Sequence, residues 1–118
     1  MTDKMKDLID KAARYYKNKG YAIGFTSPKR GVDLIVFEKG KPNDAIFVGV
    51  MDGDKVRSIP LQGFGNSQKA KTRAASLKRG AVKWIDEVEW KGVKRFDAVW
   101  VSTETTPACI SHIANINI

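Results

Sequence analysis

The chain has 118 residues, a length that suits one domain able to bury its core without disulfide or metal support. Its 21 Lys and Arg against 13 Asp and Glu give a formal net charge of +8, which favours polyanionic partners, nucleic acid first. The sequence has no apolar run long enough for a membrane span, no secretory signal at its start and one cysteine. We therefore expect a cytoplasmic protein with no membrane partner and no multi-cysteine metal site.

The first predicted element is a helix. Its apolar residues recur at steps of three and four, which is the spacing of one helical face: Met5, Leu8, Ile9, Ala12, Ala13 and Tyr16. Thr2 or Asp3 can cap its start, and Gly20 suits its end.

Short runs of β-branched and aromatic residues then predict strands at 21–25, 32–37 and 45–50, with a turn at 26–31. The third run contains almost no polar residue, so we expect a strand that is covered on both faces. Asp52-Gly53 predicts a tight turn into a further strand at 55–59.

A second helix is predicted from a cap at Asn66 or Ser67 to about residue 85, with Gly80 as a weak point where it could break. A strand at 96–101 follows. The tail, residues 102–118, alternates only weakly and carries no strand prediction. This order predicts an α/β fold, a central mixed sheet flanked by helices, in a single domain over residues 1–118.

Several short segments occur in a characteristic order: Val32-Asp33-Leu34-Ile35, Phe47-Val48-Gly49-Val50, Arg95-Phe96-Asp97 and Ile110-Ser111-His112. In this order they resemble the YraN-like family of small bacterial proteins. That family is similar to the PD-(D/E)XK endonucleases, and to Holliday-junction resolvases in particular. The resemblance covers nearly the whole chain and implies a restriction-endonuclease-like core.

The resemblance also implies a site. In that superfamily an Asp and a Glu on adjacent strands hold Mg²⁺, and a Lys two residues after the Glu assists the reacting water. Asp33 matches the Asp, whereas Gly49 and Met51 stand where the Glu and the Lys belong. Because neither side chain can bind a hard cation, we expect Asp33 to be a vestigial catalytic residue and the protein to need no cofactor. Mg²⁺ would be required only by an active enzyme.

Two alternatives concern the acidic residues. Asp52 or Asp54 could complete a metal site with Asp33, which would give an active metal-dependent nuclease with non-standard carboxylates. The other interpretation of this segment is a turn, which Asp-Gly pairs favour. Asp33 could likewise be a strand-edge carboxylate bonded to the backbone or to Lys29 or Arg30.

The basic residues predict phosphate contacts, because no Asp or Glu occurs between Asp54 and Asp86. The candidates are Lys29, Arg30, Lys69, Lys71, Arg73, Lys78 and Arg79. The expected function is that of a catalytically degenerate nuclease-fold protein that binds DNA or RNA through backbone phosphates. A protein-interaction module is the alternative, and His112 is interpreted as a surface or partly packed residue.

Overall fold

A mixed β-sheet lies between two helices in this computed structural model, which describes residues 2–29, 31–41, 44–54, 56, 59–60 and 63–118. The elements are α1 (Asp3–Asn18), β1 (Ala22–Lys29), β2 (Val32–Phe37), β3 (Asp44–Asp52), α2 (Gln68–Val88), β4 (Val93–Ser102) and β5 (Cys109–Ile113). The five strands follow the order β1-β2-β3-β4-β5, with β3 and β4 parallel and the other neighbours antiparallel. The predicted α/β fold with a central mixed sheet is confirmed.

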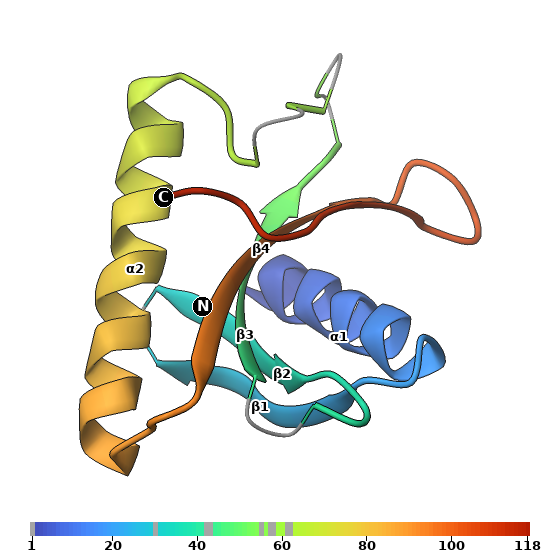
Figure 1. Cartoon of the computed structure of the whole chain (residues 1–118). Coiled ribbons are helices and arrows are strands. Elements are labelled where there is room, and N and C mark those ends of the chain that lie inside the picture. Colours follow the sequence, from blue (N-terminus) through green and yellow to red (C-terminus); the bar gives the residue numbers. More distant parts are fainter. Residues whose placement is uncertain (1, 30, 42–43, 55, 57–58, 61–62) are drawn as a thin grey trace.

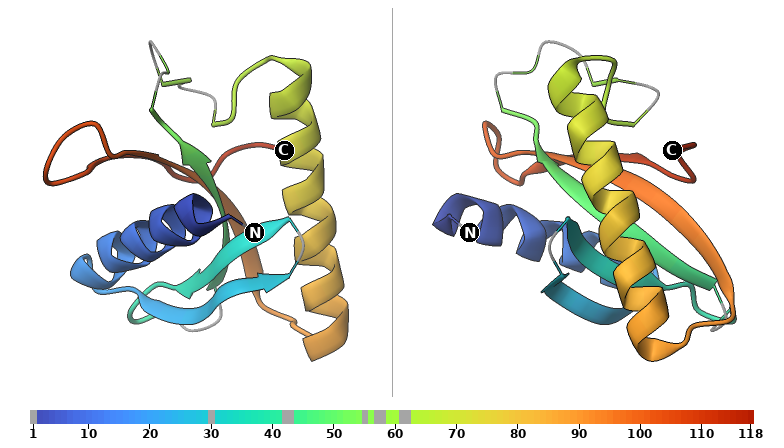
Figure 2. Two further views of the ribbon diagram at one scale, coloured as in Figure 1. Left: turned by 180° about the vertical axis from the view of Figure 1, so that it is seen from behind. Right: turned by 90° about the vertical axis from the view of Figure 1, so that its left-hand side faces the viewer.

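The helices cover opposite faces of the sheet (Figures 1 and 2). Side chains alternate along β3, because successive residues of a strand point to opposite faces. Val48 and Val50 pack with the buried residues of α1, whereas Phe47 packs with Leu77 and Trp84 of α2. The expectation that residues 45–50 form a strand covered on both sides is therefore confirmed.

Both helices begin at predicted caps. The Thr2 hydroxyl accepts a hydrogen bond from the Met5 N–H at 3.2 Å, and the Ser67 hydroxyl accepts one from the Ala70 N–H at 3.1 Å. α2 continues through Gly80, which is buried on the side that faces the sheet. Packing of this face against the sheet outweighs the cost of about 1 kcal/mol that a helical glycine carries. Neither described helix combines the length and the apolar character needed to cross a bilayer.

Some boundaries differ from the predicted ones. β1 runs to Lys29 through most of the predicted turn at 26–31. This is compatible with Pro28 because β1 is an edge strand, where a missing N–H breaks no required ladder bond, and its pairing is irregular between Thr26 and Lys29. β5 was not predicted at all. The strand predicted at 55–59 falls mostly on residues outside the described part of the chain.

Gly31 lies where the β1–β2 segment meets α2. Its φ is +93°, and a Cβ placed on it would lie 2.2 Å from the Ser76 backbone oxygen. Gly40 also has a positive φ, +84°, but open space around it.

These two glycines provide a matched test of this contact. We expect Gly40→Ala to lower the free energy of unfolding by about 1 kcal/mol through backbone strain alone. Gly31→Ala should lower it by about 3 kcal/mol because overpacking is added to the same strain. Urea denaturation of both variants measures the difference, and equal losses would contradict the close approach of Gly31 to α2.

Candidate functional site

Asp33 lies on β2 and is paired with an arginine. The Arg73 guanidinium of α2 donates through Nη2 to Asp33 Oδ2 and through Nη1 to the Gly31 carbonyl, the latter at 2.7 Å. The Val50 N–H donates to the same carboxylate at 2.7 Å. Burial raises the pKa of Asp33, and Arg73 and the Val50 N–H oppose that rise. The charge of Asp33 is thus neutralised by a side chain of the protein itself, that of Arg73.

The space beside this ion pair is filled. A Cβ placed on Gly49 would lie 2.6 Å from the Phe64 ring and 3.2 Å from Arg73 Nη2. The Arg73 guanidinium lies over the Phe64 ring, 5.7 Å from its centroid, and Met51 packs among the apolar residues on the same face. An acidic side chain at position 49 would therefore displace both Phe64 and Arg73.

Asp52 and Asp54 are bonded elsewhere. Lys4 of α1 lies 2.8 Å from Asp52 Oδ2 and 3.5 Å from Asp54 Oδ2, so these carboxylates meet α1 whereas Asp33 meets α2. Asp54 accepts bonds from the Ser102 hydroxyl and from the Thr103 N–H and hydroxyl, and the Thr103 hydroxyl is the leading cause that lowers the pKa of Asp54 to about 2.

The structure does not bring Asp52 or Asp54 together with Asp33 in the postulated metal site. Among the described residues, no group of three or more His, Cys, Asp or Glu side chains could hold a metal ion. The Asp54 N–H instead donates to Asp52 Oδ1 at 2.9 Å, which is the local bond of an Asx turn.

The basic residues of α2 fall into two groups, one paired inside the protein and one exposed to solvent. Arg73 points inward to Asp33, whereas five others are exposed and form no ion pair within the described part of the chain: Lys69, Lys71, Lys78, Arg79 and Lys83. Arg30 lies outside the described residues, and only the backbone of Lys29, at the end of β1, is described.

Two hollows flank the exposed side of α2. Thr72, Ser76, Arg79 and Lys83, here called the α2 stripe, follow the helical steps i, i+4, i+7 and i+11 and line a hollow of about 440 Å³. Lys71 and Lys78 border a second hollow of about 430 Å³, which lies against the C-terminal tail and is here called the tail groove. Lysine, arginine and hydroxyl groups are the usual donors to phosphate oxygens.

A buried carboxylate that sequence reasoning missed lies on the other face of the sheet. Asp97 of β4 has no exposed surface. It accepts bonds from the Tyr16 hydroxyl at 2.9 Å, from Arg95 through two nitrogens at 3.0 Å each, and from the Asn115 N–H at 2.9 Å. His112 Nε2 lies 2.7 Å from Asp97. We call these residues the Asp97 network.

The Asp97 network holds α1, β4, β5 and the tail together. Burial acts to raise the pKa of Asp97, but the hydrogen bonds from His112, Arg95 and Asn115 outweigh it and lower the pKa to about 2. A signal was present in the sequence, because Arg95 and Asp97 are two residues apart and hence on one face of a strand. The prediction for His112 did not include this buried partner.

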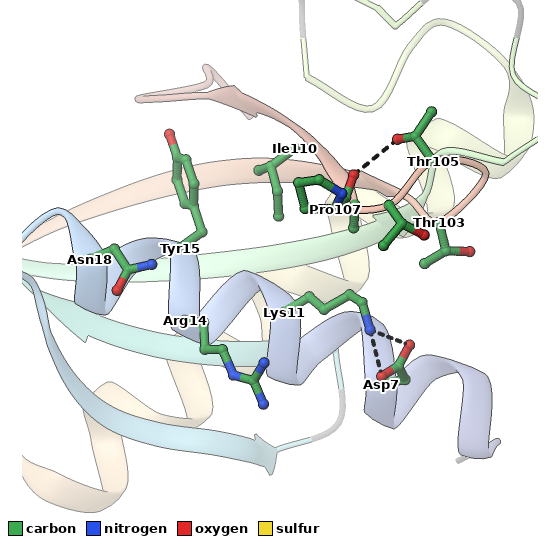
Figure 3. A pocket seen from close by; sticks show the side chains of 11 residues that line it. Asp7, Lys11, Arg14, Tyr15, Asn18, Thr103, Thr105, Pro107 and Ile110 are labelled. Carbon is green, nitrogen blue, oxygen red and sulfur yellow. Dashed lines mark hydrogen bonds and ion pairs between the residues drawn. The ribbon is translucent and has the colours of Figure 1, made fainter.

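A further cleft of about 560 Å³ lies between α1 and the β4–β5 loop (Figure 3). Tyr15, whose hydroxyl lies 2.9 Å from His112 Nδ1, forms part of its wall. Most of its polar groups are occupied: Lys11 bonds both Asp7 oxygens at 2.8 Å, and the Thr105 hydroxyl donates to the Pro107 carbonyl at 3.0 Å. These bonds leave fewer groups of this cleft available to a ligand.

No protein-family model matches the sequence of this chain, and no curated protein is significantly similar to it. Conclusions about its function therefore depend on the chemistry of its own residues.

The pKa of Asp97 gives a prediction about stability and pH. Because the folded-state pKa is depressed from the ordinary 3.8 to about 2, the ionised carboxylate stabilises the fold above pH 4. That stabilisation, about 2 kcal/mol, should be lost as the pH falls from about 4 through about 2. In Asp97→Asn this part of the acid dependence should disappear, as urea unfolding at a series of pH values would measure. Asp10→Asn, on the exposed side of α1, serves as the control, and identical acid dependence in both variants would contradict the assignment.

The Asp33–Arg73 pair gives a second prediction. Arg73→Met should lower the free energy of unfolding at neutral pH by about 2–3 kcal/mol, because Asp33 keeps its charge without its cation. The loss should shrink as the pH falls toward the ordinary range of a carboxyl group, because burial raises the pKa of Asp33 and Arg73 no longer opposes that rise, so the carboxyl group becomes protonated. Asp33→Asn combined with Arg73→Met should recover part of the loss, and a double-mutant cycle by urea denaturation measures the coupling. Additive losses would contradict the pairing.

Proposed function

We propose that this chain binds nucleic acid through the backbone phosphates and is built on a nuclease-like core that has lost its catalytic site. The order of helix, three-strand meander, helix and strand is the one that the resemblance to the YraN-like and PD-(D/E)XK proteins implies. The parallel pairing of β3 with β4 across α2 is compatible with that core. Both features support the finer fold assignment.

The exposed surface of α2 carries the proposal. Five lysine and arginine side chains project from it, and no acidic residue occurs in the sequence from 55 to 85. α2 has 21 residues and is therefore about 30 Å long, so its cations can follow several successive phosphates of one strand. Thr72 and Ser76 add hydroxyl donors beside Arg79 and Lys83. Such contacts bind all sequences alike because phosphates carry no sequence information.

The state of the Asp33 site argues against an active nuclease. Catalysis would need a metal held by at least one further carboxylate, and Arg73 and Phe64 occupy the space beside Asp33. Met51 supplies no charge to a developing phosphorane. We therefore favour binding without cleavage.

Loss of the α2 cations tests the proposal. The variant Arg79→Ala/Lys83→Ala should weaken binding to duplex DNA of any sequence. If both residues contact phosphates, it should also flatten the plot of log affinity against log salt by about two, since each contact contributes about 0.9. Fluorescence-anisotropy titrations at several salt concentrations measure both effects.

The matched control removes the same charge from the other helix. Lys6 and Lys17 are exposed on α1, so Lys6→Ala/Lys17→Ala should leave the salt slope within about half a unit of the wild-type value. No binding to duplex, branched or single-stranded substrates at low salt would contradict the proposal and favour a protein-interaction module. Mg²⁺-dependent cleavage that disappears in Asp33→Ala would instead favour an active enzyme.

A further inference from the structure

The tail groove differs from the rest of the basic surface because its floor is apolar. Phe64, Ala70 and Ala74 form the floor, with Phe64 and Ala70 buried, and Lys71 and Lys78 stand at its rim. Its volume of about 430 Å³ lies within the range of about 300–1,000 Å³ common for ligand pockets. A surface that only contacted phosphates would need no apolar floor.

Small residues on α2 create the hollow. Ala70, Ala74 and Ala75 line it at positions where longer side chains would fill the space between the helix and the tail. Ala75 is exposed and makes the groove accessible from solvent. A longer side chain at one of these positions would therefore narrow the groove.

The residues that line the groove are held in place before any ligand binds. The Arg73 guanidinium lies over the Phe64 ring, and Arg73 is fixed in turn by Asp33. On the other side, the Ile116 N–H donates to the Phe96 carbonyl at 2.7 Å, which ties the tail to β4 immediately before Asn117 and Ile118. A preformed site loses less entropy on binding than one that must order itself.

The chemistry of the groove suits a nucleobase with its neighbouring phosphates. A base has apolar faces and a polar edge, and the groove offers an apolar floor together with the amides of Asn66 and Asn117. Lys71 and Lys78 are seven residues apart and so about 10 Å apart along the helix, which places cations toward both ends of the groove. In a duplex the bases are stacked and paired, so only an unpaired base can enter.

We propose that the tail groove takes an unpaired base of a single-stranded nucleic acid, with Lys71 and Lys78 on the adjacent phosphates. The inference rests on the proposed function and extends it by naming the preferred substrate class. In this proposal the α2 stripe contributes to the affinity for single-stranded and double-stranded nucleic acid alike. The tail groove adds affinity only for a strand with an accessible base.

An abasic strand isolates that contribution. Fluorescein-labelled oligothymidylate and an abasic oligonucleotide of equal length carry the same phosphates but differ in their bases. We expect wild-type protein to bind the oligothymidylate about tenfold more tightly than the abasic strand, as base contacts of this kind typically provide. Ala75→Leu and Ala74→Leu should each bring that ratio close to one while leaving duplex affinity within about twofold.

The controls separate the groove from the rest of α2. Val82 is exposed on α2 outside the groove, so Val82→Leu places the same leucine side chain elsewhere on the helix and should keep the wild-type ratio. Thermal unfolding shows whether each variant is folded, and Ala75→Leu, at an exposed position, keeps the test valid if Ala74→Leu is destabilised. Duplex binding with equal affinity for the oligothymidylate and abasic strands would overturn the groove inference and leave the proposed function intact. A ratio unchanged in folded Ala75→Leu would overturn it too, and absence of binding to every substrate would overturn both proposals.

Discussion

The buried carboxylate of Asp97 is the constraint on which the arrangement of α1, β4, β5 and the tail depends. A fully buried charge is tolerated only when its hydrogen bonds are satisfied, and Asp97 receives them from Tyr16, Arg95, His112 and the Asn115 N–H. These donors come from the helix, the same strand, the neighbouring strand and the tail. Because each must be in place for the charge to be buried, the network selects one relative position of these elements. The tail wall beside α2 is held from the opposite face of the sheet through this network.

The second carboxylate, Asp33, fixes the other helix. It is bonded to Arg73 of α2, and Arg73 also bonds the Gly31 carbonyl and lies over Phe64. Asp97 on one face of the sheet and Asp33 on the other are thus each paired with an arginine, Arg95 and Arg73 respectively. The inward orientation of Arg73 leaves the remaining basic residues of α2 to face solvent. α2 thus carries a structural arginine, Arg73, among cations that face solvent.

Hydrophobic periodicity was sufficient to predict both helices and the central strands, because their buried faces are almost entirely apolar. It failed for β5, where the buried face includes His112, whose partner is a charge and not an apolar side chain. The acid-free stretch from 55 to 85, together with the resemblance, had placed Arg73 among the predicted phosphate contacts. Arg73 is three residues after Ala70 and four before Leu77, both buried, so its position already indicated the inner side of the helix. The Asp33–Arg73 pair and the tail groove could not be predicted, since both depend on which segments meet α2 in three dimensions.

The crowding around Gly49 bears on how this chain could change over evolutionary time. A single substitution of Gly49 by an acidic residue would make the new side chain clash with Phe64 and Arg73. It would also place a second carboxylate beside Asp33, whose charge Arg73 now neutralises. An oxygen-lined metal site would thus require at least three coordinated replacements, of which the intermediates either clash or leave a charge without its partner. The present packing therefore makes it difficult for single substitutions to create a metal site at Asp33. Selection can meanwhile alter the five exposed cations of α2 one at a time, because they form no ion pair within the part of the chain that the structure describes.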